Sequence, residues 1–519
     1  MALTSRIPRG FANLSFLVSL DMGSNNFQGN LPREMAHLRQ LKFLDSSVNS
    51  FNGKIPSWFG FLHQIQVLNL RNNSFTGSIA SSFSNMSTLE TLNMNFNSIE
   101  GKIPKVIGKL INLRVLKLEG IVPQEIENLN NLMELLMQKN QITGSVPISI
   151  FNISSLQILS LWKNNLSGFL PREIGNLTKM QILQLSGNKL IGEIPKEISN
   201  LVELEELDLA DNSFSGQLDM EIFNISGLRI IDLTDNNISG SLPPNIGCIL
   251  PNIEELYLND LTNLVGTIPH SISNCSKLTI LDLAGNKLTS LIPKSLGYLT
   301  HLQILILEEK NLTSDSSFSF LSSLTSCRNL TLLVRSFNPL NGVLPASMGN
   351  LSTSLRTFVA NSCKIQGRIP NEVGNLSSLL FLYLSGNNLV GSIPTSIGNL
   401  RNLQRFDLTN NKLSGFIGDY ICKLQHLGDI YFGHNHLSGS LPYCLGNITS
   451  LREIHLGSNK LSSNIPPSLV NLQDLVVLDL SSKDMVGSLP PEIGNLKDVT
   501  LIDVAVNQFS NCKLWGTYL

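Results

Sequence analysis

One feature of this sequence constrains its fold more than any other: a repeat of 24 residues marked by asparagine. Within each run of repeats, the asparagines lie 24 residues apart or a multiple of 24. The runs are Asn25, Asn49, Asn73 and Asn97; Asn140, Asn164, Asn188, Asn212 and Asn236; Asn286; and Asn387, Asn411, Asn435, Asn459 and Asn507. The 519 residues hold about 21 such units, so the repeat fills the chain and leaves no room for a separate domain.

Every unit has the same internal order of residue types, as in 182–195 (ILQLSGNKLIGEIP), 281–293 (LDLAGNKLTSLIP) and 382–394 (LYLSGNNLVGSIP). The alternation at 207–209 (LDL) predicts a short strand with one buried face. The asparagine amide can then bond the backbone of a turning chain, the glycine permits a tight bend, and Ile-Pro fixes an extended return path. One unit cannot bury its leucines alone, so the units must stack into a solenoid with an asparagine ladder along it.

Composition and motifs exclude several classes of protein. Lys+Arg 37 against Asp+Glu 39 gives a net charge of −2, without the basic excess that nucleic-acid binding needs. A hydrophobic content of 42% can bury a large core, which argues against a disordered chain. No apolar run reaches the length of a membrane helix. The sequence has no phosphate-binding glycine loop, H-E-x-x-H motif or kinase catalytic loop, so we expect neither enzyme activity nor a cofactor.

From about Pro8 to Asn507 the chain resembles the leucine-rich repeat family in its plant-type form, marked by the L-x-G-x-I-P segment. The stretches 13–35 (NLSFLVSLDMGSNNFQGNLPREM) and 320–333 (FLSSLTSCRNLTLL) are similar to the ectodomains of plant receptor-like kinases that sense microbial peptides. The resemblance implies an α/β repeat solenoid, a curved right-handed leucine-rich repeat superhelix with a concave parallel β-sheet, as a single domain over 1–519.

The resemblance also makes both ends of the chain look cut. Ectodomains of this family begin with a signal peptide and a cysteine-bearing cap, and they close with a second cap. Residues 1–16 are interpreted as an incomplete first unit, because Leu17, Leu20, Met22 and Asn25 are already in phase with the repeat. We therefore expect a fragment of a longer receptor, without caps, signal peptide, membrane helix or kinase.

A few positions break the pattern. The unit near 113–131 is shortened to 19 residues and lacks its ladder asparagine, which predicts a kink or an error in the gene model. Lys310 and Lys483 replace the ladder asparagine in two other units, where we expect looser turns. Cys363 fills the same place in a further unit, and cysteine is a known substitute in the family pattern.

The cysteines do not form an obvious disulfide framework. Cys422 and Cys444 lie in consecutive units, 22 residues apart, but at different offsets within the unit, so good disulfide geometry is not expected. Cys275 and Cys327 stand where other units place a core leucine, and we predict buried free thiols at both positions.

Three histidines occur close together in adjacent units, namely His434, His436 and His455. A metal site would need further ligands within tetrahedral reach. Solvent-facing histidines are the favoured interpretation, and no metal is predicted.

Fourteen N-x-S/T sequons indicate a secreted glycoprotein, although the repeat itself generates N-L-S and N-L-T phrases. The candidate glycosylation sites are Asn13, Asn72, Asn85, Asn152, Asn165, Asn176, Asn224, Asn237, Asn274, Asn311, Asn329, Asn350, Asn375 and Asn447.

In such a repeat the strands line the concave face, and their non-leucine positions point outward. About 4.8 Å per strand gives roughly 100 Å for twenty units. One outward column contains Tyr383, Asp407, Tyr431, His455 and Asp479; an earlier one contains Asp208, Asp232, Tyr257 and Asp282, and Trp162 lies on the face of the seventh unit. Aromatic rings between carboxylates suit an extended peptide with basic groups, and simple solvent-facing filler is the alternative.

The longest unit exceeds 24 residues by four. Steroid-binding receptors of the family that this chain resembles place a folded island within the solenoid, and four extra residues are too few to form one. The predicted ligand is therefore a peptide or a protein.

Two classes of function agree with these features. The first is the ligand-binding region of a plant receptor-like kinase on the extracellular side of the plasma membrane, in defence or developmental signalling. The resemblance implies a co-receptor near the last units and a serine/threonine kinase encoded downstream. The second is a secreted binding protein, such as an inhibitor of microbial cell-wall hydrolases. A non-functional gene fragment is a third possibility.

Overall fold

The computed structural model describes residues 3–99, 101–118, 120–218, 220–308, 311–481 and 484–509. The chain divides into two compact units, residues 1–239 (unit 1) and residues 240–519 (unit 2). In the part of the chain that the structure describes, no helix is long and apolar enough to cross a lipid bilayer.

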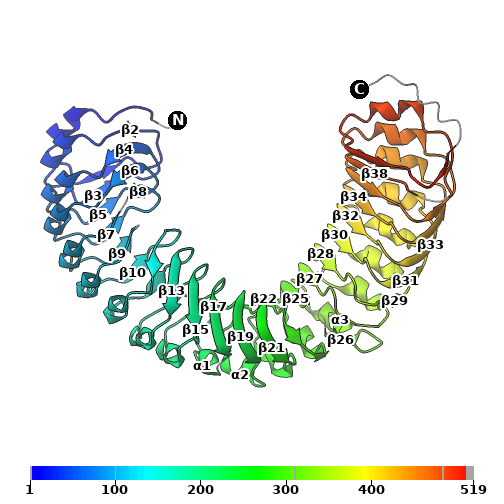
Figure 1. Cartoon of the computed structure of the whole chain (residues 1–519), viewed down its shortest axis with the longest axis horizontal. Helices are drawn as coiled ribbons and strands as arrows, with labels where there is room; N and C mark the ends of the chain where they lie inside the picture. The colour runs from blue at the N-terminus through cyan, green and yellow to red at the C-terminus, as the bar shows by residue number, and fades with distance from the viewer. Residues whose placement is uncertain are drawn as a thin grey trace. The chain divides into compact units, whose positions relative to one another are not determined.

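Short parallel strands form the principal sheet of each unit, one strand per repeat (Figure 1). Each has three residues, and from the second repeat to the last but one the middle residue is buried while its neighbours are half-buried, except for Ser160 of β12, which is buried. The strands of unit 1 are β1 (Ser19–Asp21), β3 (Phe43–Asp45), β5 (Val67–Asn69), β7 (Thr91–Asn93), β9 (Val115–Lys117), β10 (Glu134–Leu136), β12 (Ile158–Ser160), β14 (Ile182–Gln184), β16 (Glu206–Asp208) and β18 (Ile230–Asp232). Those of unit 2 are β20 (Glu255–Tyr257), β22 (Ile280–Asp282), β25 (Ile304–Ile306), β27 (Leu332–Val334), β28 (Thr357–Val359), β30 (Phe381–Tyr383), β32 (Arg405–Asp407), β34 (Asp429–Tyr431), β36 (Glu453–His455), β38 (Val477–Asp479) and β40 (Leu501–Asp503).

These 21 strands within the described residues confirm the predicted long parallel sheet and the repeat count. Within each unit, consecutive strands pair in register, so Leu183 of β14 is opposite Leu207 of β16, and Leu382 of β30 is opposite Phe406 of β32. Equivalent outward positions therefore line up in columns.

Helical turns form the other side of each repeat. Most are 3₁₀ helices of five residues, and many begin directly after the proline of the Ile-Pro segment, since Pro195 and its equivalents hold an extended conformation there. The 3₁₀ helices are η1 (Arg9–Asn13), η2 (Arg33–His37), η3 (Ser57–Phe61), η4 (Ser81–Asn85), η5 (Lys105–Lys109), η6 (Gln124–Asn128), η7 (Ile148–Asn152), η8 (Arg172–Asn176), η9 (Lys196–Asn200), η10 (His270–Asn274), η11 (Lys294–Tyr298), η12 (Leu324–Ser326), η13 (Ala346–Asn350), η14 (Asn371–Asn375), η15 (Thr395–Asn399), η16 (Asp419–Lys423), η17 (Tyr443–Asn447), η18 (Pro467–Asn471) and η19 (Pro491–Asn495). The short α-helices are α1 (Met220–Phe223), α2 (Ile246–Ile249) and α3 (Ser319–Ser323).

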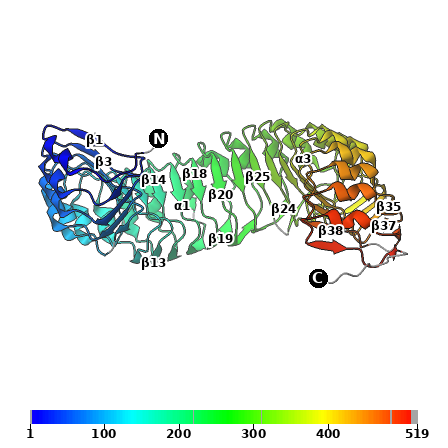
Figure 2. The ribbon, with the colours of Figure 1, turned by 90° about the horizontal axis from the view of Figure 1, so that it is seen from above.

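A second set of short parallel strands follows the asparagine turns. Figure 2 separates the two sets in unit 1, where β14 lies near the upper edge of the ribbon and β13 near the lower edge. The second set comprises β2 (Gln28–Gly29), β4 (Ser50–Lys54), β6 (Ser74–Gly77), β8 (Ser98–Ile99), β11 (Thr143–Gly144), β13 (Asn165–Phe169), β15 (Lys189–Gly192), β17 (Ser213–Gln217), β19 (Asn236–Ser241), β21 (Leu261–Gly266), β23 (Lys287–Leu288), β24 (Ser290–Leu291), β26 (Leu312–Thr313), β29 (Gln366–Gly367), β31 (Asn388–Gly391), β33 (Lys412–Phe416), β35 (His436–Gly439), β37 (Lys460–Leu461), β39 (Val486–Gly487) and β41 (Gln508–Phe509).

The asparagine ladder is present, and each amide bonds to backbone groups of two successive repeats. The Nδ2 of Asn411 donates to the carbonyl of Leu408 in its own turn (3.0 Å) and to that of Leu384 in the preceding repeat (2.9 Å). Its Oδ1 accepts from the N–H of Leu389 in the preceding repeat (3.0 Å). The same three contacts recur at Asn49, Asn73, Asn97, Asn164, Asn188, Asn212, Asn236, Asn286, Asn338, Asn387, Asn435, Asn459 and Asn507.

The irregular repeats keep the principal sheet continuous. In the shortened repeat near 113–131, β9 pairs with both β7 and β10, so the lost residues come from the turn and not from the strand. Cys363 occupies the ladder position and its Sγ contacts the carbonyl of Arg335 (3.0 Å). Leu261 replaces the ladder asparagine in one further repeat and is buried, at 1% exposure. The asparagine spacing alone did not identify this substitution. Lys310 and Lys483 lie outside the described residues.

The expectation against a Cys422–Cys444 disulfide is wrong, because the structure contains this bond, with the two Cα atoms 5.8 Å apart. The fourth residue of one 3₁₀ helix packs over the second residue of the next, which is 22 positions later. A Cβ added at Gly398, the fourth residue of η15, would lie 2.8 Å from the carbonyl oxygen of Tyr420, the second residue of η16. Cys422 and Cys444 hold these same two places in η16 and η17, so their different offsets are what bring them together.

The predicted burial of Cys275 and Cys327 is confirmed, since both are free, fully buried thiols. Burial raises the pKa of Cys275 to about 12 and that of Cys327 to about 11. Both thiols are therefore held in the unreactive protonated form.

One core position carries an arginine. Arg335 follows β27 where most other repeats place leucine, and it is fully buried. Its guanidinium carbon lies 5.2 Å from the ring centre of Phe318, 5.7 Å from that of Phe320 and 4.7 Å from that of Phe358. Within the described residues, none of its three side-chain nitrogens has a hydrogen-bond partner. Burial accordingly lowers the pKa of Arg335 to about 10.

We expect Leu207→Ala to lower the free energy of unfolding by about 2–5 kcal/mol, because Leu207 is fully buried in β16 and its truncation leaves a cavity. Denaturant unfolding of the purified protein measures this effect. Val202→Ala is the matched control: Val202 is 68% exposed in the same repeat and should change stability by no more than about 0.5 kcal/mol. Equal losses in the two variants would contradict the assignment of the core face.

We expect Arg335→Leu to stabilise the protein by about 1–4 kcal/mol, because leucine removes a buried charge from an aromatic cage and restores the residue type of the other repeats. Thermal unfolding should shift to higher temperature in this variant. Arg328→Leu, at an exposed position of the same repeat, is the control and should leave the transition in place. A lower transition temperature for Arg335→Leu would show that the three rings compensate the buried charge.

Candidate functional site

The column predicted from the sequence is continuous in unit 2. Tyr383, Asp407, Tyr431, His455 and Asp479 are the last residues of β30, β32, β34, β36 and β38, and each is the register partner of the next. All five side chains are half-buried. The structure therefore places this predicted set side by side on one face of the sheet.

A second column, which the sequence interpretation missed, runs beside the first. It consists of the first residues of the same strands and includes Phe381, Arg405, Asp429 and Glu453. In a strand of three residues with a buried centre, both end residues face the same side. The period-two pattern already contained this signal, because it places the residue before each buried position on the outer face as well as the residue after it.

Arg405 is held in place by Asp429. The Nη2 of Arg405 lies 2.6 Å from Oδ2 of Asp429, and Nε donates to the same oxygen at 2.6 Å. The guanidinium carbon is 5.7 Å from the ring centre of Tyr431. Burial lowers the pKa of Arg405, but the hydrogen bond and the charge of Asp429 outweigh this effect and raise the pKa above its ordinary value.

Tyr431 and His455 form an aromatic platform next to this ion pair. Their ring centres are 4.7 Å apart with an interplanar angle of 13°. The hydroxyl of Tyr431 donates to Oε2 of Glu453, and Nε2 of His455 lies 3.2 Å from the same oxygen. The hydrogen bond from Tyr431 lowers the pKa of Glu453, whereas burial and this carboxylate raise the pKa of Tyr431.

The other predicted contact residues lie elsewhere. Tyr257 ends β20, pairs in register with Asp282 and donates to Oε2 of its neighbour Glu255 (2.9 Å). In unit 1, Asp208 and Asp232 are register partners at the ends of β16 and β18.

Trp162 lies beyond the end of β12, in the turn that follows the strand. The Nζ atoms of Lys139 and Lys163 lie 4.7 Å and 5.4 Å from its ring centre. Trp162 therefore contacts cations of its own chain and does not continue the strand-end column of unit 1.

The structure does not bring the three histidines into one group. His434 belongs to the turn after β34, His436 begins β35 and His455 ends β36. Among the described residues, no three His, Cys, Asp or Glu side chains are placed to hold a metal ion. All candidate glycosylation asparagines are exposed except Asn165, which is half-buried.

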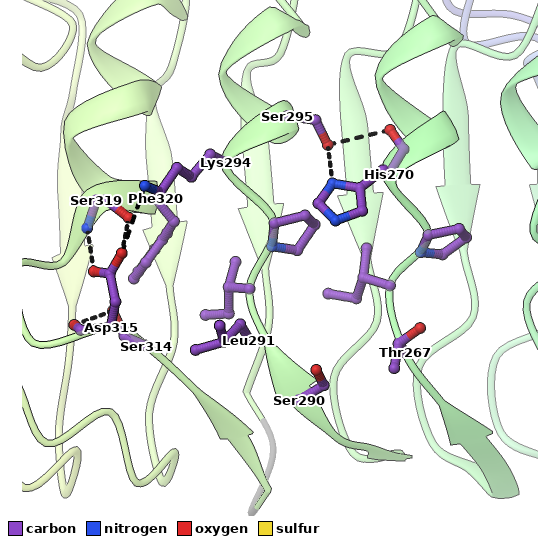
Figure 3. A pocket seen from close by; sticks show the side chains of 14 residues that line it. Thr267, His270, Ser290, Leu291, Lys294, Ser295, Ser314, Asp315, Ser319 and Phe320 are labelled. Carbon is purple, nitrogen blue, oxygen red and sulfur yellow. Dashed lines mark hydrogen bonds and ion pairs between the residues drawn. The ribbon is translucent and has the colours of Figure 1, made fainter.

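A pocket of about 390 Å³ lies away from these columns, where the longest repeat of unit 2 departs from the regular path (Figure 3). Leu291 and Phe320 are among its apolar lining residues. Its lysine and its aspartate are paired: Lys294 lies 3.7 Å from Asp315, and the backbone N–H of Ser319 donates to Asp315 at 2.8 Å. This pocket contains none of the residues predicted to bind a ligand, and its charges neutralise one another.

Models of known protein families match the repeats of both units. The leucine-rich repeat region model matches residues 334–486. Leucine-rich repeat models also match residues 63–121, 130–190, 154–214, 227–249 and 277–299. These matches agree with the strand ladder and the asparagine turns described above.

Among curated proteins, the chain is similar to the receptor kinase-like protein Xa21 of Oryza sativa subsp. japonica, with 48% identity over 67 residues. That match covers 13% of this chain and 6% of Xa21. The chain thus spans only a small part of the length of this relative.

Solved structures extend the similarity to nearly the whole chain. The plant peptide hormone receptor RGFR1, solved in complex with RGF2, has 34% identity and a TM-score of 0.84, over 98% of this chain and 80% of that chain. The Arabidopsis receptor kinase HAESA, solved with the peptide hormone IDA and the co-receptor SERK1, has 30% identity and a TM-score of 0.73, over 98% and 84% of the two chains. The chain therefore belongs to the leucine-rich repeat family and is homologous to the ectodomains of plant receptor kinases.

Proposed function

We propose that this chain is the extracellular, ligand-binding region of a plant receptor kinase, and that it binds an extended peptide along the two columns of unit 2. The observation that carries the proposal is the in-register alignment of Tyr383, Asp407, Tyr431, His455 and Asp479 on one open face. Solved relatives of similar length carry peptide hormones, which supports a ligand of the same class.

The aromatic residues would act as anchors for the peptide. Tyr431 is fixed from two sides, by its stack on His455 and by its hydrogen bond to Glu453. Tyr383 stacks on Phe381, with ring centres 6.4 Å apart. A ring that is already ordered before binding loses little conformational entropy on contact, so such residues carry much of the affinity at an interface.

The proposal includes a second protein. A co-receptor kinase would join the complex near the last repeats, and the presence of the co-receptor SERK1 in the solved HAESA complex supports a partner of this kind. Ligand binding would then activate a serine/threonine kinase encoded beyond this chain, in defence or developmental signalling at the plasma membrane. The secreted hydrolase inhibitor is the alternative that the same fold allows.

We expect Tyr383→Ala and Tyr431→Ala to weaken peptide binding by about tenfold or more each, because each removes an anchor ring worth at least about 1.4 kcal/mol. The measurement uses peptides selected from a random display library against the secreted wild-type protein, with affinities from calorimetry. Circular dichroism of each variant checks that the fold is retained.

Tyr298→Ala and Tyr443→Ala are the matched controls. These tyrosines lie in η11 and η17 and are 76% and 68% exposed, so they are at least as available as Tyr383 and Tyr431 but belong to the helical side of the repeat. Their affinities should equal that of the wild type. Selected peptides that lose affinity only in the control variants would place the binding surface on the helical side and refute the proposal.

A further inference from the structure

We infer that the site selects a peptide with two basic side chains about four residues apart, on either side of an apolar residue. The inference rests on the proposed function and specifies the ligand that the columns of unit 2 would accept. It follows from which carboxylates are already committed to protein partners, which are not, and how far apart the uncommitted ones lie.

From β32 to β38 the two columns contain four carboxylates, and two of them are engaged within the protein. Asp429 is paired with Arg405 and is only 14% exposed. Glu453 accepts from both Tyr431 and His455 through one oxygen. These two acids position neighbouring side chains, and the charge of Asp429 is neutralised by Arg405.

Asp407 and Asp479 differ from them. Oδ1 of Asp407 accepts the backbone N–H of Thr409 (2.9 Å), and Oδ1 of Asp479 accepts the N–H of Ser481 (3.0 Å) and its hydroxyl (2.6 Å). Within the described residues, Oδ2 of each aspartate has no protein donor. The turn thus fixes each carboxylate in orientation and leaves one oxygen able to accept from a basic group of a ligand.

The spacing of these two acids sets a length. Asp407 ends β32 and Asp479 ends β38, three strands further along the same column. Three steps of about 4.8 Å separate them by roughly 14 Å. An extended peptide that crosses the strands rises about 3.3 Å per residue, so side chains four residues apart are roughly 13 Å apart. An even separation also places both side chains on the same face of the peptide, toward the sheet.

The stack of Tyr431 and His455 occupies the column between the two acids. A ligand residue midway between the two basic residues faces the sheet as well, because it is two positions from each. It would contact the aromatic platform, which favours an apolar or aromatic side chain at this place.

Asp503 continues the column by one strand, and its Oδ1 accepts the N–H of Ala505 (2.9 Å). It lies about 19 Å from Asp407, close to six residues of extended chain. A peptide with basic residues six positions apart should therefore bind more weakly than one with four, because it passes over Asp479 without pairing with it. When Asp479 is neutralised, the peptide with separation six should become the tighter binder.

The experiment uses synthetic fluorescent peptides with two lysines separated by two, four, six or eight positions around a central phenylalanine. Fluorescence anisotropy measures their affinities for the secreted chain. We expect the peptide with separation four to bind at least tenfold more tightly than those with separations two and eight, and to weaken as salt is raised. Asp407→Asn should weaken it about tenfold, and Asp479→Asn should shift the preferred separation from four to six.

Asp474→Asn and Asp498→Asn remove the same charge from exposed positions before β38 and β40 and should leave the affinities and the spacing preference unchanged. Peptides that bind without a spacing preference, or with one that Asp407→Asn and Asp479→Asn do not alter, would overturn this inference. In that case the proposed function survives if Tyr431→Ala still weakens the binding of library-selected peptides by about tenfold or more. If library-selected peptides also bind independently of Tyr383 and Tyr431, both the inference and the proposed function fail.

Discussion

The structure depends on one interaction, the bonding of each ladder asparagine to two successive repeats. A turn that reverses direction inside a stack leaves backbone donors and acceptors away from water, and each unpaired group would cost about 1–3 kcal/mol. The amide of Asn411 satisfies two carbonyls and one N–H at once, and two of these belong to the preceding repeat. Each asparagine thus closes its own turn and also fixes the neighbouring repeat in register.

Because register is fixed at every turn, irregularities remain local. The repeat near 113–131 loses part of its turn, yet β9 keeps both strand partners. The longest repeat adds α3 and two phenylalanines that surround Arg335. In each case the strand with its buried centre is kept and the change falls in the connection.

The same register creates the candidate site. Outward residues at equivalent positions lie about one strand spacing apart, so a column of single substitutions becomes a continuous surface. Within this surface the groups have different roles. Arg405 with Asp429, and Tyr431 with Glu453 and His455, form rigid pairs and platforms, whereas Asp407 and Asp479 each keep one oxygen without a donor among the described residues.

The sequence by itself determined the solenoid, the repeat count, the ladder and the column from Tyr383 to Asp479, because a strict 24-residue period carries all of these. It also identified the buried thiols Cys275 and Cys327. It could not determine contacts that depend on how one repeat sits on the next. The Cys422–Cys444 bond follows from the 22-residue offset between stacked 3₁₀ helices, and the 24-residue spacing puts Arg405 beside Asp429 without showing that their side chains pair. Such contacts depend on how the side chains of neighbouring repeats pack, and the 24-residue period gives no information about that packing.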